Sequence, residues 1–210
     1  MSRGPAGRPS PMTTEPIDLR PAAHRLAAIV RGVRDDQLTS PTPCPEYTVG
    51  DLLDHIGGLA TAFTWAATKE SLAMPDVSPT GDATNLGADW RRRIPADVEA
   101  LGDAWTDPAA WTGMTKAGPI EMPGEIGGLV ALDEVVIHGW DVAVATGQPF
   151  HVDAEELAAV HTFAAMFSGP GTEEQRAGGF GPELTVADDA PLLERVLAML
   201  GRDAGWRPSG

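Results

Sequence analysis

The stretch GEIGGLVALDEVVIHGWDVAVAT, residues 124–146, determines how we interpret this chain of 210 residues. Placed on a helix, it is apolar over most of its circumference, and Gly147 follows it at a position suited to a left-handed C-terminal cap. A helix that is apolar nearly all round is buried in a protein core. We therefore expect a buried helix over residues 124–146.

Three ionisable residues share one stripe of this helix, namely Glu134, His138 and Asp141. Residues four apart on a helix lie on the same face, so Glu134 and His138 can act together. A buried carboxylate must be paired, protonated or bound to a metal ion. The spacing alone leaves two interpretations open, a local hydrogen-bonded pair or half of a metal site.

Further helices follow from apolar periodicity and from start signals such as Thr48 with Asp51, which resembles a capping box. Pro95 predicts a kink or a break in one of them. Between the helices we expect an extended connection or short hairpin at 111–122, a flexible glycine-rich interval at 168–182 and a short strand at 184–186. The expected helices, besides 124–146, cover residues 19–33, 49–67, 86–105, about 153–167 and 191–200.

His55 lies at the edge of the apolar stripe of the helix expected at 49–67, so it should point partly into the bundle. Together with Glu134 and His138 it would complete a set of two histidines and one carboxylate. Zinc enzymes use such sets when a fourth coordination position must stay open. Asp141, one turn beyond His138, either orients that imidazole or reaches solvent. Asp54 and Asp133 point about 100° away from the neighbouring ligands and should be solvated.

Composition excludes several classes of partner. The formal net charge of −15 would repel nucleic acid and anionic membrane surfaces, and no apolar run reaches the length of a membrane-spanning helix. Cys44 is the lone cysteine, which fits a reducing, cytoplasmic location and is typical of a small packed side chain. We expect a disordered leader at 1–16, a helical bundle at 17–168, and a linker with a small appendage at 169–210.

Two segments carry a resemblance to a known family. They are TPCPEYTVGDLLDH at residues 42–55 and DEVVIHGWDVA at residues 133–143, the latter followed by ATG at 145–147. Both look like signature segments of the DinB-like superfamily, in the branch of mycothiol-dependent maleylpyruvate isomerase N-terminal domains. LGRD at 200–203 and the nearby Trp206 also resemble that branch. The resemblance covers about residues 19–206.

The resemblance implies a mainly α fold, a DinB-like four-helix bundle with a small C-terminal strand and helix appendage. It implies a divalent metal ion, Zn²⁺ or Ni²⁺ or another, held by His55, Glu134 and His138. It also implies a low-molecular-weight thiol such as mycothiol as cosubstrate, which would attack a small electrophilic substrate as a thiolate. Arg202 is the basic candidate for substrate binding in the matching tail.

One departure from the family and two alternative interpretations keep other functions open. The thiol-dependent isomerase has a fuller C-terminal domain with basic substrate-binding residues, so we do not expect maleylpyruvate isomerase activity itself. A closed metal site, with Asp141 or Cys44 as a fourth ligand, would favour a non-catalytic metal-binding or small-ligand-binding bundle. The third alternative is an interaction module that uses an apolar bundle face, and we expect a monomer or a homodimer.

Overall fold

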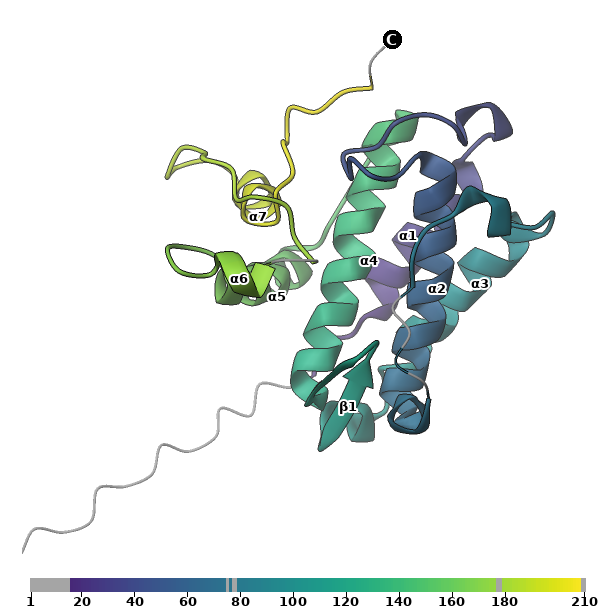
Figure 1. The fold of residues 1–210 in the computed structure, drawn as a ribbon, viewed down its shortest axis with the longest axis vertical. Coiled ribbons are helices and arrows are strands. Elements are labelled where there is room, and N and C mark those ends of the chain that lie inside the picture. Colours follow the sequence, from purple (N-terminus) through teal and green to yellow (C-terminus); the bar gives the residue numbers. More distant parts are fainter. Residues whose placement is uncertain (1–15, 75, 77–78, 177–178, 209–210) are drawn as a thin grey trace, which may run out of the picture.

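Four long helices pack side by side in the computed structural model, which describes residues 16–208 except 75, 77–78 and 177–178 (Figure 1). Helices α1 and α2 each contact both α3 and α4, so the four helices surround one apolar core. This arrangement confirms the expected mainly α bundle. The bounds are α1 (Arg20–Gly32), α2 (Val49–Thr68), α3 (Trp90–Ala104) and α4 (Gly124–Thr146).

Helix α4 is the most enclosed element of the bundle, and its bounds agree with those predicted from the sequence. It starts directly after Pro123 and ends at Gly147, whose φ of 70° is the left-handed conformation expected there. The amide of Gln148 donates to the carbonyl of Ala143 at 2.8 Å and closes the C-terminal turn. Because neighbours cover it on several sides, Asp133, His138 and Asp141 on this helix are held away from water.

Helix α2 begins with the capping box that the sequence predicts. The amide of Thr48 donates to Asp51 Oδ2 at 2.9 Å, and the amide of Asp51 donates to Thr48 Oγ1 at 3.3 Å. These bonds satisfy backbone donors at the start of the helix and fix where the first turn lies. They therefore also fix the turn of α2 on which His55 lies.

Helix α3 differs from its prediction at one end. It begins at Trp90, four residues after the predicted start at Leu86, and continues through Pro95 without a break. Gly87 adopts a φ of 63°, outside the helical region, so the helix cannot include it. Ile94 and Val98 are buried on either side of Pro95, and this packing compensates for the one missing backbone donor.

A β-hairpin closes one end of the bundle, which confirms the hairpin alternative for residues 111–122. Strands β1 (Met114–Ala117) and β2 (Ile120–Pro123) pair antiparallel, with Ala117 opposite Ile120 and Met114 opposite Pro123. Nearby, Trp105 Nε1 donates to the carbonyl of Phe63 at 3.1 Å. The hairpin, which contacts α2 and α4, and Trp105, which follows α3, therefore connect these three helices at this end.

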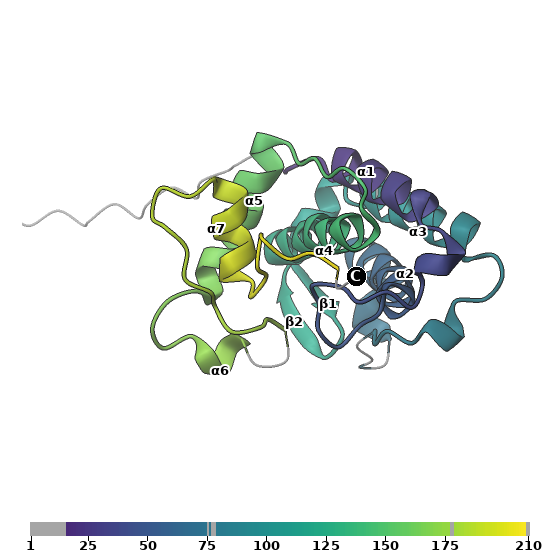
Figure 2. The ribbon, with the colours of Figure 1, turned by 90° about the horizontal axis from the view of Figure 1, so that it is seen from above.

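The remaining helices lie on the far side of α4 from the other bundle helices, as the view from above shows (Figure 2). They are α5 (Ala154–Ala164), α6 (Glu173–Arg176) and α7 (Leu192–Met199). Helix α5 contacts both α4 and α7, so the appendage covers a face of α4 that would otherwise meet water. This cover explains why α4 is apolar nearly all round.

Two expectations for the C-terminal part are wrong. Residues 184–186 do not form a strand, because the Leu184 amide bonds to the carbonyl of Ala198 at the end of α7 and finds no partner strand. The glycine-rich interval contains a regular element, α6. Its Arg176 side chain is buried and donates to the carbonyls of Phe167 and Gly181, which holds the interval together despite its glycines.

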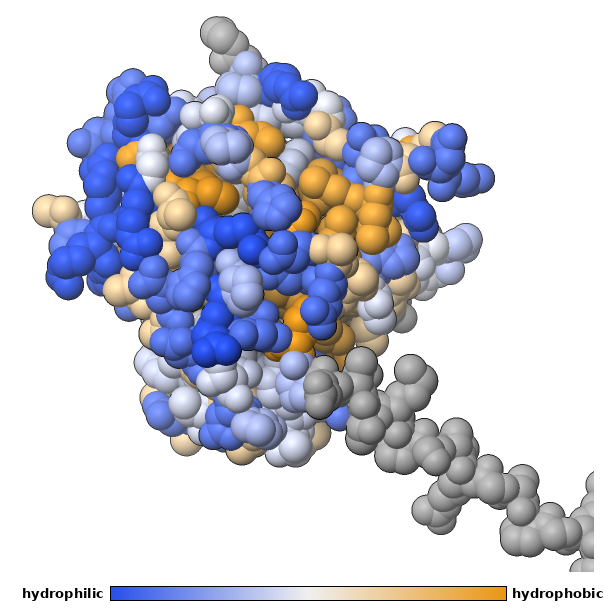
Figure 3. Space-filling view, turned by 180° about the vertical axis from the view of Figure 1, so that it is seen from behind, coloured by the Kyte–Doolittle hydropathy of each residue, from blue (hydrophilic) through white to orange (hydrophobic). Residues whose placement is uncertain are grey.

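Short 3₁₀ turns connect the main elements. None of the described helices has the length and apolarity needed to cross a membrane. Seen from behind, the surface is largely hydrophilic, with hydrophobic areas separated by polar side chains (Figure 3). The 3₁₀ turns are η1 (Asp35–Gln37), η2 (Glu70–Ala73), η3 (Ala83–Asn85), η4 (Pro108–Trp111) and η5 (Ala165–Phe167).

Two glycines of α4 provide a matched test of this packing. A Cβ at Gly128 would lie 2.5 Å from the ring of Trp111, whose indole is fixed by a 2.8 Å hydrogen bond to Trp105. We expect Gly128→Ala to lower the free energy of unfolding by about 1 to 2 kcal/mol, since overpacking outweighs the gain in helix propensity. Gly139→Ala, with its nearest contact at 3.6 Å, should be neutral or stabilising. Urea denaturation compares the two, and equal stabilities would contradict the prediction.

Candidate metal centre

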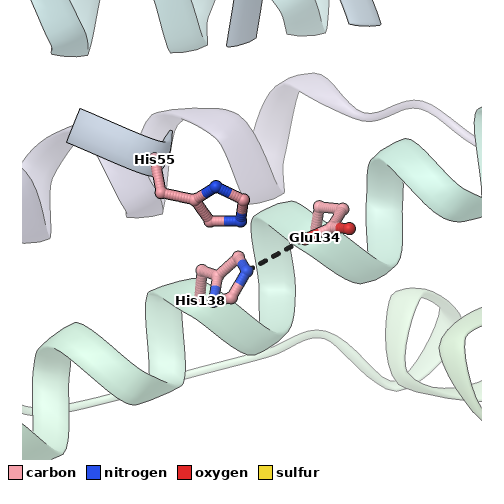
Figure 4. Close-up of side chains that lie close together, drawn as sticks. All are labelled: His55, Glu134 and His138. Atoms are coloured by element: carbon pink, nitrogen blue, oxygen red, sulfur yellow. Dashed lines mark ion pairs between the residues drawn. The ribbon is translucent and has the colours of Figure 1, made fainter. Parts of the chain in front are cut away.

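The structure brings His55 of α2 together with Glu134 and His138 of α4. One donor atom from each residue lies within 4.8 Å of the other two, and the three side chains face a common space between the helices (Figure 4). Among the residues that the structure describes, no other group of three His, Cys, Asp or Glu side chains comes this close. Spacing alone left open whether His55 meets Glu134 and His138, and in the structure the three side chains lie together.

His138 is held on both ring nitrogens by carboxylates of its own helix. Its Nε2 lies 3.0 Å from Glu134 Oε2, on the side of His55, and its Nδ1 lies 3.0 Å from Asp141 Oδ2. Asp141 is fully buried, so it does not reach solvent and instead orients the imidazole, which was the first of its two predicted roles. The i, i+3 and i, i+4 spacings of α4 place all three groups in one row.

His55 is oriented from outside its own helix. Its Nδ1 lies 3.0 Å from the carbonyl oxygen of Pro79, which leaves Nε2 free on the side of Glu134 and His138. The Tyr47 ring packs against the His55 ring at 5.2 Å between centroids. Sequence reasoning missed both Pro79 and Tyr47. Neither has a spacing signal, because one lies 24 residues downstream in a loop and the other precedes α2.

The electrostatics of the centre follow from burial and these contacts. Burial acts to lower the pKa of His138, but the hydrogen bonds to Asp141 and Glu134 outweigh burial and raise that pKa to about 9. For Glu134, burial acts to raise the pKa, and the hydrogen bond and charge of His138 lower it overall. Burial and the nearby His138 lower the pKa of His55. These shifts favour a protonated His138 between two carboxylates and a neutral His55.

The donor set fits a divalent transition metal. Two imidazole nitrogens and one carboxylate oxygen are ordinary ligands of Zn²⁺, with bonds of about 2.0 to 2.2 Å. Each histidine has its outward nitrogen bound to a protein acceptor, which leaves the inward nitrogen as the ligand atom, as in other histidine metal sites. Glu134 keeps 29% of its side-chain surface exposed, so the centre remains accessible.

Arg202 reaches this centre from the C-terminal tail. Its Nη2 lies 3.3 Å from Asp141 Oδ2, its Nη1 donates to the carbonyl of Leu200, and the side chain is 11% exposed. The guanidinium therefore contacts the residue that orients His138. Cys44 is half-buried in the loop before α2, and burial raises the pKa of its thiol. It is not in the group of three donors.

The two neighbouring aspartates behave differently from each other. Asp54 is half-buried, and its carboxylate accepts from the Asp82 amide at 3.1 Å, on the outer side of α2. Asp133 is 4% exposed, so the expectation that it is solvated is wrong. Burial, with the charge of Glu134, raises the pKa of Asp133 well above its usual range. Helical spacing does not disclose this burial, because it comes from tertiary packing around α4.

Comparisons with known proteins give one family model and two relatives that match this chain. Residues 19–143 match the model of the mycothiol maleylpyruvate isomerase N-terminal domain, a match that includes His55, Glu134 and His138. Two uncharacterized proteins, from two strains of Mycobacterium tuberculosis, are each 31% identical over 188 residues. Each alignment covers 86% of this chain and 93% of the relative. No solved structure matches the chain.

The charge state of His138 is directly measurable. In metal-free protein, NMR titration should give His138 a pKa of about 9, and Asp141→Asn should lower it, because the acceptor that stabilises the imidazolium loses its charge. A histidine whose pKa is raised by folding contributes stability that is complete below its unfolded pKa near 6.5 and disappears as pH rises through 9. That part of the pH dependence should be weaker in Asp141→Asn. Titration near 6.5 in both proteins would contradict the assignment.

Proposed function

The chain belongs to the mycothiol maleylpyruvate isomerase N-terminal domain family, and from this membership we propose that it is a divalent-metal enzyme. The metal is zinc, nickel or another divalent cation, held by His55, Glu134 and His138. The reaction is a thiol-dependent transfer or isomerisation on a small electrophilic substrate. The observation that carries the proposal is the convergence of these three donor atoms within 4.8 Å of one another.

His55, Glu134 and His138 would hold a divalent cation and leave one position for an incoming thiol, whose pKa such a cation would lower, so that the thiol would be available as a nucleophilic thiolate at neutral pH. The residues of the chain prepare that position. Asp141 keeps a proton on His138 Nδ1, so that Nε2 presents its lone pair. The Pro79 carbonyl does the same for His55. Ligation at His138 requires the loss of its second proton, so metal affinity should rise with pH up to about 9.

Arg202 has a different role in this proposal from direct substrate binding. Its guanidinium is mostly buried and is engaged with Asp141 and with the Leu200 carbonyl. A residue in this position holds Asp141 in place beside His138 and links the C-terminal tail to the centre. Thiol chemistry at this centre therefore needs a group other than Arg202 to recognise the electrophile. The electrophile approaches from the side of Glu134, whose side chain is 29% exposed.

Metal content tests the ligand assignment. Protein stripped with a chelator and reloaded with zinc should retain about one ion per chain after desalting, measured by inductively coupled plasma mass spectrometry. The zinc affinity of His55→Ala should be at least about 100-fold lower than that of wild type. Changes to residues that only hydrogen-bond to a metal ligand already cost about 10- to 100-fold, and this change removes a ligand itself. His151→Ala is the matched control, because His151 is exposed and pairs only with Asp153. Unchanged stoichiometry in His55→Ala would remove the ligand assignment.

Thiol binding separates the enzyme from the non-catalytic alternative. Cobalt-loaded protein titrated with a low-molecular-weight thiol should develop a sulfur-to-cobalt charge-transfer band, and cobalt-loaded wild-type protein without thiol provides the baseline. Zinc-loaded protein should then accelerate the addition of that thiol to small electrophiles. If the protein holds metal tightly but several thiols and electrophiles give neither band nor turnover, the catalytic proposal is wrong. A metal-binding or small-ligand-binding bundle would then remain.

A further inference from the structure

We propose that the segment 79–81 is a positioning element, pressed onto α2 so that the Pro79 carbonyl fixes the tautomer and direction of His55. The inference rests on the proposed function, because it assigns a role to residues outside the metal ligands. Its basis is the 3.0 Å contact between His55 Nδ1 and the carbonyl oxygen of Pro79. A carbonyl oxygen can only accept, so this contact requires the proton of a neutral His55 to sit on Nδ1.

The first supporting observation is how closely the segment approaches the helix. A Cβ at Gly58 would lie 2.7 Å from Pro79 Cβ, and a Cβ at Gly81 would lie 2.3 Å from the backbone oxygen of Asp51. Real Cβ contacts are not this short, so both positions require glycine for the segment to lie where it does. Glycine inside a helix costs about 1 kcal/mol relative to alanine. At Gly58 that cost allows the Pro79 carbonyl to reach His55.

The second supporting observation is that the segment is anchored on the helix side by groups around His55. The Gly81 amide donates to the Tyr47 hydroxyl at 3.2 Å, and the same tyrosine ring packs against His55. The amide of Ala83 donates to Asp51 Oδ1 at 2.8 Å. The Asp82 amide donates to Asp54 at 3.1 Å. Three successive amides are therefore held by the residues that flank His55, which leaves the Pro79 carbonyl little freedom to move.

The consequence is specific to the imidazole. With its proton fixed on Nδ1, His55 presents an unprotonated Nε2 toward Glu134 and His138. Without the Pro79 carbonyl, the ring can rotate or take the other tautomer, whose Nε2 carries the proton and cannot bind a metal. The element therefore acts on metal affinity through one ligand, while the contacts of His138 with Glu134 and Asp141 stay as they are.

Gly58→Ala tests the proposal. The added methyl group should displace Pro79 and its carbonyl, while the helix keeps or gains stability. We expect zinc affinity, measured by competition with a chromophoric chelator, to fall 10- to 100-fold. The cobalt spectrum should change as well. Gly139→Ala is the control, a helix glycine with room for a methyl group, and its affinity should equal wild type. Equal affinities and spectra for Gly58→Ala and wild type would overturn the proposal.

A compensating change distinguishes displacement of the carbonyl from general disturbance of α2. Pro79→Gly removes the Cβ and Cγ that the new methyl group meets, at 2.7 and 3.4 Å, but retains the carbonyl. The double variant Gly58→Ala with Pro79→Gly should therefore regain most of the lost affinity. Gly58→Ala with Pro79→Ala keeps the clashing Cβ and should not. Absence of this difference between the two double variants would also overturn the proposal.

A metal-independent measurement separates this inference from the proposed function. Long-range ¹H–¹⁵N spectra of metal-free protein should place the proton of His55 on Nδ1 in wild type and in Gly139→Ala, and this preference should be lost in Gly58→Ala. If wild type binds no metal, the proposed function fails, and the tautomer comparison still decides whether the Pro79 segment positions His55. A wild-type proton on Nε2 would refute the positioning role whatever the metal result.

Discussion

Ionisable groups in the interior of α4 must be paired or neutral, and the contacts of the centre meet that requirement for Glu134, His138 and Asp141. Moving a charged carboxylate or imidazolium out of water costs several kcal/mol unless hydrogen bonds and opposite charge compensate for the lost hydration. His138 meets the requirement through Glu134 on one nitrogen and Asp141 on the other. Asp141 in turn pairs with Arg202 from the C-terminal tail. Acidic and basic side chains therefore alternate along the row of Glu134, His138, Asp141 and Arg202.

This chain of contacts joins the C-terminal appendage to the centre, because the guanidinium of Arg202 contacts Asp141, and helix α5 packs against α4. Asp133, on the same helix as Asp141, is a buried carboxyl, and burial with the charge of Glu134 raises its pKa, which is unfavourable for its charged form. The appendage therefore changes the electrostatic environment of α4 through Arg202, although it contributes none of the three donor atoms.

Features of the fold and the centre that depend on contacts between residues close in the sequence were predicted correctly in most cases, and features that depend on distant contacts were not predicted from the residue pattern. The ends of α4 and the capping box at Thr48 depend on neighbouring residues, and both were predicted correctly. The pairing of Glu134, His138 and Asp141 also follows from helical spacing. The start of α3 was missed because Gly87 adopts a positive φ, and Asp133 was misplaced because its burial comes from tertiary packing that helical spacing does not show. That His55 meets α4 depended on the family resemblance, since no spacing rule links two helices so distant in the chain.

The two histidines of the centre are therefore held by different kinds of structure. His138 takes its orientation from carboxylates three and four residues away on one helix, so this half of the centre is local to α4 except for the contact of Arg202 with Asp141. His55 takes its orientation from a loop carbonyl, and that carbonyl depends on Gly58, Gly81 and Tyr47. Changes in the loop can thus alter one ligand without touching the helical motif. Two proteins with the same three ligand residues need not hold a metal equally well, because the second half of the centre is determined by backbone packing outside the motif.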